Sequence, residues 1–206
     1  MSPVADRPRR IFTIVEGHGE VEALPVLLWR LQARYAPEAW IDVGRPFRVG
    51  RDTLLAEQGV ENALDTALPR GPAPDGLLIL LDSDDDCPVT LANGLRDRIE
   101  AARPGLSHAV VFAHREFEAW FLAAAESLRG CQGLDAAITA PAAPESIRGC
   151  KEWLSRYRPP GDPYKPKADQ AGLAAAFDLD MARAGAPSFD KFCRDITYLI
   201  TGKRGN

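Results

Sequence analysis

Arg10-Ile-Phe-Thr-Ile-Val-Glu16-Gly17-His18-Gly19-Glu20 is the stretch that decides how the rest of the chain is interpreted. Five residues with strand character, Ile11 to Val15, lead into a carboxylate and a Gly-x-Gly turn, and a helical pattern follows at once. Open α/β sheets bind their ligands beyond the carboxyl ends of the strands. Glu16, at the mouth of this β→α turn, is therefore the first candidate for chemistry.

The composition indicates one medium-sized globular unit. The chain has 206 residues, of which 46% are hydrophobic and 26% charged, enough to bury a substantial core. Its net charge of −4 excludes a polycation that coats nucleic acid, so such a partner would be held by a local patch or through metal ions. The four cysteines form no CxxC pair, and no signal peptide or apolar run of about 20 residues is present. We expect a cytoplasmic protein with reduced thiols and no membrane partner.

Strand and helix patterns alternate along the first 130 residues. After a basic tail (residues 1–9) and the first strand, apolar residues from Val21 to Tyr35 recur at helical spacing. Residues 40–49 are expected to hold one or two short strands, and Thr53 to cap a single helix that runs to Leu68. Residues 69–76 are expected to form a loop.

The unbroken apolar run Leu77–Leu81 indicates a strand covered on both faces, as in a parallel sheet, and a helix over Val89–Ala102 and a strand over Ala109–Ala113 follow. This alternation predicts an α/β fold, Rossmann-like, with a mostly parallel central sheet flanked by helices. Beyond Gly130, short helices are expected near 145–157, 167–177 and 188–200, the last capped by Ser188. We expect residues 1–130 to form the α/β core and residues 131–206 a helical extension packed on it, as one structural unit.

Acidic residues follow three of the predicted strands: Glu16, then Asp82 and Asp84, then Glu116 and Glu118. The carboxyl ends of parallel strands lie on one edge, so these side chains are expected to converge. Gathered carboxylates repel one another unless a cation neutralises them, and hard oxygen ligands suit Mg²⁺ or Mn²⁺. Asp82 and Asp84 could share one ion, while Glu16 ligates a second or acts as general acid or base. Phosphoryl transfer uses this combination.

Other ligand-binding motifs do not fit the sequence. Asp82-x-Asp84-x-Asp86 imitates an EF-hand loop, but Cys87 stands where the glycine is required. Gly17-x-Gly19 lacks the third glycine of a dinucleotide fingerprint, and the chain has no P-loop sequence. Acidic turns after strands also serve as solvated loops, so a purely structural role for any single acid stays open.

A local excess of positive charge lies between residues 148 and 167, with Tyr157 and Tyr164 interleaved. It could follow a phosphate backbone, or it could be an ordinary solvated surface. Lys165 is expected to lie nearest the acids. The basic residues of this stretch are Arg148, Lys151, Arg156, Arg158, Lys165 and Lys167.

The strand ending in Glu16-Gly17, the helix that starts near Glu20 and the strand ending in Asp82-x-Asp84 together resemble the Toprim domain of topoisomerases, primases and overcoming-lysogenization-defect type nucleases. Over nearly its whole length the chain is most similar to the domain of unknown function 4276 family. That narrower resemblance rests on four short segments: Val15–Glu20, Leu81–Asp86, Arg115–Phe121 and Tyr164–Lys167.

The resemblance implies Mg²⁺-dependent phosphoryl transfer on DNA or RNA. It implies Glu16 as general acid or base, Asp82 and Asp84 as metal ligands, and Glu116 or Glu118 as a further acid at the metal. Without the topoisomerase tyrosine context or the primase zinc module, a nuclease is favoured. Relatives often accompany ATPases in anti-phage systems, which implies an ATPase partner.

Two further roles complete the sequence hypothesis. Gly17 and Gly19 are expected to clear space around a metal-bound phosphate, with Glu20 as a ligand or a support behind the ligands, and Lys165 is expected to contact phosphate. The alternative hypothesis is a non-catalytic nucleic-acid-binding or effector subunit of an ATPase-containing complex.

Overall fold

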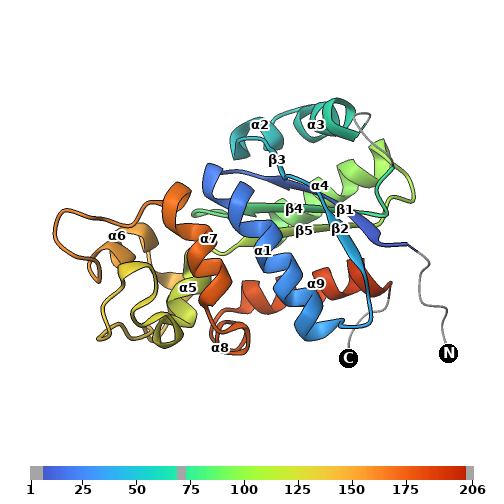
Figure 1. Cartoon of the computed structure of the whole chain (residues 1–206). Helices are drawn as coiled ribbons and strands as arrows, with labels where there is room; N and C mark the ends of the chain where they lie inside the picture. The colour runs from blue at the N-terminus through green and yellow to red at the C-terminus, as the bar shows by residue number, and fades with distance from the viewer. Residues whose placement is uncertain (1–6, 69–72, 203–206) are drawn as a thin grey trace.

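The computed structural model, which describes residues 7–68 and 73–202, contains a parallel β-sheet with helices on both faces (Figure 1). The strand order is β2-β1-β4-β5, and β3 pairs with β1 beyond the end of β2. Every strand pair is parallel. The strands are β1 (Arg9–Val15), β2 (Ile41–Val43), β3 (Phe47–Arg48), β4 (Gly76–Asp82) and β5 (His108–Ala113).

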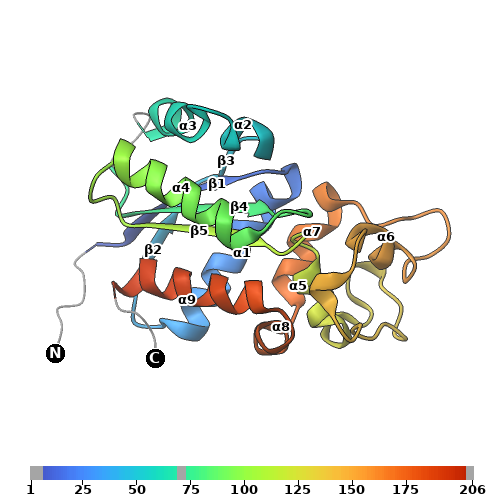
Figure 2. The ribbon, with the colours of Figure 1, turned by 180° about the vertical axis from the view of Figure 1, so that it is seen from behind.

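The helices form two layers and a C-terminal group. Helices α2, α3 and α4 cover one face of the sheet and α1 and α9 the other, while α5 to α8 gather beyond the carboxyl ends of the strands (Figures 1 and 2). The α/β class, the parallel sheet and the helical C-terminal region predicted from the sequence are thereby confirmed. The helices are α1 (His18–Tyr35), α2 (Arg51–Leu55), α3 (Gly59–Ala67), α4 (Pro88–Ala102), α5 (Ala119–Ala123), α6 (Cys150–Ser155), α7 (Pro166–Ala176), α8 (Leu179–Gly185) and α9 (Pro187–Thr201), with 3₁₀ turns at Ala125–Leu128, Cys131–Gly133 and Pro144–Ser146.

Strand β4 is buried on both faces, which explains its unbroken apolar sequence. Successive side chains of a strand point to opposite faces. Leu77, Ile79 and Leu81 accordingly pack in the cluster beneath α3 and α4. Leu78 and Leu80 pack in the larger cluster on the α1 and α9 face. The central position of β4 fixes its carboxyl end, and therefore Asp82, in the middle of the sheet edge.

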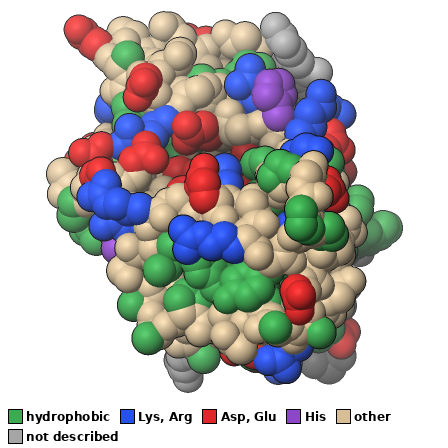
Figure 3. All heavy atoms as spheres, turned by 90° about the vertical axis from the view of Figure 1, so that its left-hand side faces the viewer, with side chains coloured by type: hydrophobic (Ala, Val, Ile, Leu, Met, Phe, Trp, Pro, Cys, Tyr) green, Lys and Arg blue, Asp and Glu red, His purple; other side chains and the backbone are tan. Residues whose placement is uncertain are grey.

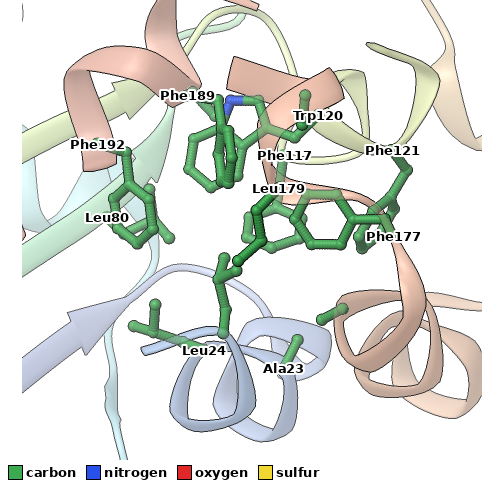
Figure 4. Close-up of a cluster of buried hydrophobic side chains, with 14 of the residues drawn as sticks. Ala23, Leu24, Leu80, Phe117, Trp120, Phe121, Phe177, Leu179, Phe189 and Phe192 are labelled. Atoms are coloured by element: carbon green, nitrogen blue, oxygen red, sulfur yellow. The ribbon is translucent and has the colours of Figure 1, made fainter. Parts of the chain in front are cut away.

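An aromatic cluster joins the C-terminal helices to the sheet (Figure 4). The fully buried Trp120 lies with its ring centroid 5.0 Å from those of Phe189 and Phe192 on α9, and 4.8 Å from that of Phe117. Its indole Nε1 donates a 2.8 Å hydrogen bond to Ser188 Oγ. This cluster holds the segment after β5, which carries Glu116 and Glu118, against α9.

Two predicted helix caps are wrong. Thr53 lies inside α2, and α2 and α3 are separate helices with Gly50 and Gln58 at their N-caps. Gln58 has a φ of 58°, and Gly59 then lies so close to the backbone of Thr53 and Leu54 that no Cβ fits. This tight turn, which only a glycine permits, divides the helix that the apolar pattern suggested.

Ser188 also does not cap α9, because the helix begins one residue earlier, at Pro187, with Ala186 as its N-cap. The Ser188 hydroxyl instead accepts hydrogen bonds from Trp120 Nε1 and from the backbone N–H of His114. Helix α8 was not predicted separately; Asp178 caps it by accepting from the backbone N–H of Met181. The predicted tail (1–9) and loop (69–76) fall partly outside the described residues.

Candidate acidic site

The carboxyl ends of β1, β4 and β5, at which the candidate acids lie in the sequence, are at one edge of the sheet, beside the region that contains α6 and α7 (Figure 1). The space-filling view of this side shows acidic and basic side chains close together in a band across the molecule (Figure 3). The parallel register pairs Val15 with Leu80 and Asp82 with Ala113, so the three strands end at nearly the same level. The topology therefore places Glu16 and Asp82 on neighbouring strand ends, as predicted.

Glu16 is half-buried, and its Oε2 is a buried oxygen without a hydrogen-bond partner. Burial raises the pKa of Glu16, and repulsion from Asp84 and Glu20 raises it further, against the opposing effects of the Asp82 backbone amide and of Arg51. A carboxyl group with a raised pKa exchanges a proton more readily near neutral pH than an ordinary surface glutamate. The surroundings of Glu16 therefore favour its protonated form more than those of an exposed glutamate do.

Asp82 is fixed where β4 ends. Its Oδ1 accepts a 2.7 Å hydrogen bond from the backbone N–H of Phe117, which connects the end of β4 to the segment after β5. Burial raises the pKa of Asp82 well above its ordinary value, and repulsion from Glu118, Glu20 and Glu16 acts in the same direction. These four carboxylates therefore share one electrostatic environment.

Glu118, rather than Glu116, belongs to this group of acids. Its side chain is fully buried, Oε1 accepts a 3.1 Å hydrogen bond from the Tyr164 hydroxyl, and burial raises its pKa. Its Oε2 has no hydrogen-bond partner, although Lys151 Nζ lies 3.2 Å away as an ion pair. The sequence could not distinguish the two glutamates, because both follow the same strand.

Both carboxylate oxygens of Glu116 instead accept hydrogen bonds from residues at the start of α6. Its Oε1 accepts from the backbone N–H groups of Gly149 and Cys150, at 2.9 and 3.0 Å, and its Oε2 accepts from Lys151 Nζ at 2.8 Å. Although burial opposes ionisation, these donors lower the pKa of Glu116. Glu116 therefore anchors the start of α6 as a stable carboxylate.

Lys151 is the lysine among the strand-end acids, whereas the sequence pointed to Lys165. Burial disfavours the charged form of Lys151, but the attraction of Glu118, Asp82 and Glu116 outweighs burial and raises the pKa of its ammonium group. Lys165 is 60% exposed, and its Nζ lies 3.5 Å from Asp162. The expectation that Lys165 lies nearest the acids is therefore wrong.

Asp84 lies at the surface rather than inside. Its side chain is 62% exposed, 3.7 Å from Arg51, and its backbone adopts a left-handed φ of 49°. The Asp84 N–H donates to the carbonyl of Arg115, which itself has a φ of 66°, so the two strand-end loops are joined. Left-handed backbone at non-glycine residues is rare and concentrates at functional sites. Asp84 therefore lies at the exposed border of the group of acids that contains Asp82.

The Gly-x-Gly turn is packed rather than open. A Cβ on Gly17 would collide with the Glu20 carboxylate, and a Cβ on Gly19 would collide with the side chain of Gln170 on α7. Gln170 Nε2 donates a 3.2 Å hydrogen bond to Glu20 Oε1, while Glu20 Oε2 has no partner. The space beside Gly19 is therefore filled by α7, contrary to the expectation that this glycine makes room for a phosphate. No sequence signal identified Gln170.

The basic stretch does not form one continuous surface. Lys151 is bound to the acids, and Arg158, only 7% exposed, bonds to Asp162 at 2.6 Å and lies 3.6 Å from Asp169. Arg148 is 69% exposed and forms a 2.7 Å ion pair with Asp85. The exposed basic residues of the stretch are Arg148, Arg156, Lys165 and Lys167.

The chemistry of the acids fits a hard divalent cation, although the ligands are not gathered into a finished site. Buried oxygens of Glu16, Glu20 and Glu118 lack hydrogen-bond partners, and Mg²⁺ needs only one or two carboxylates plus water and substrate oxygens. Within residues 7–68 and 73–202, however, no three His, Cys, Asp or Glu side chains are arranged to hold a metal ion. Of the acids at this edge of the sheet, Glu118 is buried, and Glu16 and Asp82 are half-buried.

A family comparison covers this whole arrangement. The model of the family described as "Domain of unknown function (DUF4276)" matches residues 15–197, a range that includes all of these acids and Lys151. The chain belongs to the domain of unknown function 4276 family. No curated protein and no solved structure shows significant similarity to it. Among the described residues of this family member, no helix is long and apolar enough to cross a membrane.

Proposed function

We propose that this protein is a divalent-metal-dependent nuclease with its centre at the carboxyl edge of the sheet. The proposal is carried by one observation: Glu16, Asp82 and Glu118 come from three strand ends into one shared electrostatic environment, in which Oε2 of Glu16 and Oε2 of Glu118 are buried without a hydrogen-bond partner. Such an environment favours a cation. The Toprim resemblance supports the same reaction, and anti-phage defence beside an ATPase partner belongs to the same proposal.

In this proposal, Asp82 and Glu118 hold Mg²⁺ or Mn²⁺, with Asp84 at the exposed rim. The bound metal would stabilise charge on the attacking and leaving oxygens of a phosphodiester. Glu16 takes a proton from the attacking water or gives one to the leaving oxygen, a role that its raised pKa favours. A new P–O bond to water forms as the P–O ester bond breaks.

Binding of DNA or RNA is assigned to the exposed basic residues of the 148–167 stretch. Lys165 and Lys167 lie at the start of α7, whose Gln170 bonds to Glu20, and are therefore well placed to reach a phosphate beside the acids. Arg148 extends the same charge on the side of α6. The chain as a whole is acidic. In this proposal the phosphate backbone of the nucleic acid is therefore bound jointly by these basic residues and by the metal ion.

A non-catalytic nucleic-acid-binding or effector subunit is the second candidate. The observation that favours it is Lys151, whose ammonium group already neutralises part of the acidic group without a metal. A protein of this kind would bind nucleic acid equally well with Mg²⁺ or with a chelator.

Cleavage of labelled DNA and RNA separates the two functions. The purified protein is incubated with single- and double-stranded substrates in Mg²⁺, in Mn²⁺ or in excess chelator. The nuclease proposal predicts products with at least one substrate and metal and none with chelator. Binding without cleavage under every condition would instead support the non-catalytic subunit.

A further inference from the structure

Lys151 connects the two glutamates that follow β5. Its Nζ donates a 2.8 Å hydrogen bond to Glu116 Oε2 and lies 3.2 Å from Glu118 Oε2. The side chain reaches this position from the first turn of α6, which Glu116 fixes through the N–H groups of Gly149 and Cys150. The ammonium group is therefore held in place by the fold.

The contact with Glu118 is the longer of the two, at 3.2 Å against 2.8 Å. Glu118 is fully buried, and its Oε2 has no hydrogen-bond partner in spite of the neighbouring ammonium group. A buried carboxylate oxygen without a hydrogen bond is costly, so this oxygen can gain from a better-placed positive charge. Glu116, by contrast, has three donors and would retain two of them without Lys151.

We propose that Lys151 is a built-in counter-ion that competes with the divalent cation for Glu118, so that metal binding and release of Lys151 from Glu118 are coupled. The inference rests on the proposed metal centre and adds its regulation. It explains why the acids share one environment without being arranged as a metal site: the fold supplies a positive charge of its own at Glu118. Lys151 remains hydrogen-bonded to Glu116 when it leaves Glu118.

Lys151→Met tests the competition by removing the ammonium group and keeping a similar side-chain volume. Because the competing charge is gone, Mn²⁺ should bind to the variant at least about tenfold more tightly than to the wild type, as measured by calorimetric titration. With chelator, the variant should melt at a lower temperature than the wild type, because the buried Glu118 carboxylate then lacks its positively charged partner. Adding Mn²⁺ should therefore raise its melting temperature more than that of the wild type.

Lys191→Met is the matched control. Lys191 is 34% exposed, similar to the 38% of Lys151, and likewise pairs with a carboxylate, Asp195, but on α9 and away from the strand-end acids. Its loss should leave the Mn²⁺ affinity unchanged. If Lys151→Met binds Mn²⁺ no more tightly than the wild type does, or more weakly, the counter-ion proposal is overturned.

A second measurement uses the wild-type protein, in case the variant does not fold. Amine acylation followed by mass spectrometry should show Lys151 reacting faster with Mn²⁺ than with chelator, and Lys191 reacting equally in both. Unchanged reactivity of Lys151 while calorimetry records Mn²⁺ binding would overturn the coupling and leave the metal centre intact. Tighter Mn²⁺ binding by Lys151→Met without any nucleic-acid cleavage would support the coupling and count against the nuclease. Absence of Mn²⁺ binding in both proteins would overturn the coupling and the metal centre together.

Discussion

Glu16→Gln is expected to slow Mg²⁺-dependent cleavage by about 100-fold or more while leaving the fold intact. General acid–base catalysis contributes at least about this factor, and glutamine cannot take up or release the proton. The substitution keeps the size of the side chain. Because Glu16 Oε2 has no hydrogen-bond partner, the amide removes no contact of that oxygen. Single-turnover cleavage with saturating protein measures the chemical step separately from binding.

Glu22→Gln is the control for this change. Glu22 lies on α1, its side chain is 55% exposed, and it forms a 3.0 Å ion pair with Arg45. It is therefore a solvent-exposed glutamate outside the group of strand-end acids. Its cleavage rate should equal that of the wild type. The role assigned to Glu16 fails if Glu16→Gln also cleaves at the wild-type rate.

Trp120→Ala is expected to lower the free energy of unfolding by about 3–5 kcal/mol, the range observed when a buried aromatic residue is truncated to alanine. Trp120 is fully buried and contacts Phe117, Phe189 and Phe192. The substitution opens a cavity between α5 and α9 and also removes the donor to Ser188 Oγ. Urea denaturation monitored by circular dichroism measures the loss.

The exposed Trp29 provides the comparison for this truncation. It lies on α1 with 53% of its surface exposed, so Trp29→Ala leaves no comparable cavity. Its effect on the free energy of unfolding should remain within about 0.5 kcal/mol, as is usual for surface positions. Equal losses for the two tryptophans would contradict the role assigned to the aromatic cluster.

The sequence predicted the sheet because its signals are local. The apolar run Leu77–Leu81 is long enough to show burial on both faces, and a parallel sheet brings its carboxyl ends to one edge. The same reasoning identified Glu16 and Asp82 as neighbours. It failed at the break between α2 and α3, where the close approach at Gly59 overrides a continuous helical pattern.

The groups around the acids could not be predicted in the same way. Lys151, Tyr164 and Gln170 reach Glu118 and Glu20 only because the C-terminal helices pack against the carboxyl edge. Between 33 and 150 residues separate such partners along the chain, for example Glu116 from Gly149 and Glu20 from Gln170. Spacing within the sequence carries no information on contacts of this kind, and for that reason it does not distinguish Lys151 from Lys165.

The central claim is that the strand-end acids form a divalent-metal centre, and a calorimetric titration of Mn²⁺ into the wild type and Asp82→Asn tests it most directly. Asparagine can still accept the hydrogen bond from Phe117 N–H, so the variant removes the charge and keeps the connection between β4 and the next segment. We predict saturable Mn²⁺ binding to the wild type. The affinity of Asp82→Asn for Mn²⁺ should be lower by a factor of about ten or more. No binding to the wild type, or equal binding to both proteins, would contradict the account.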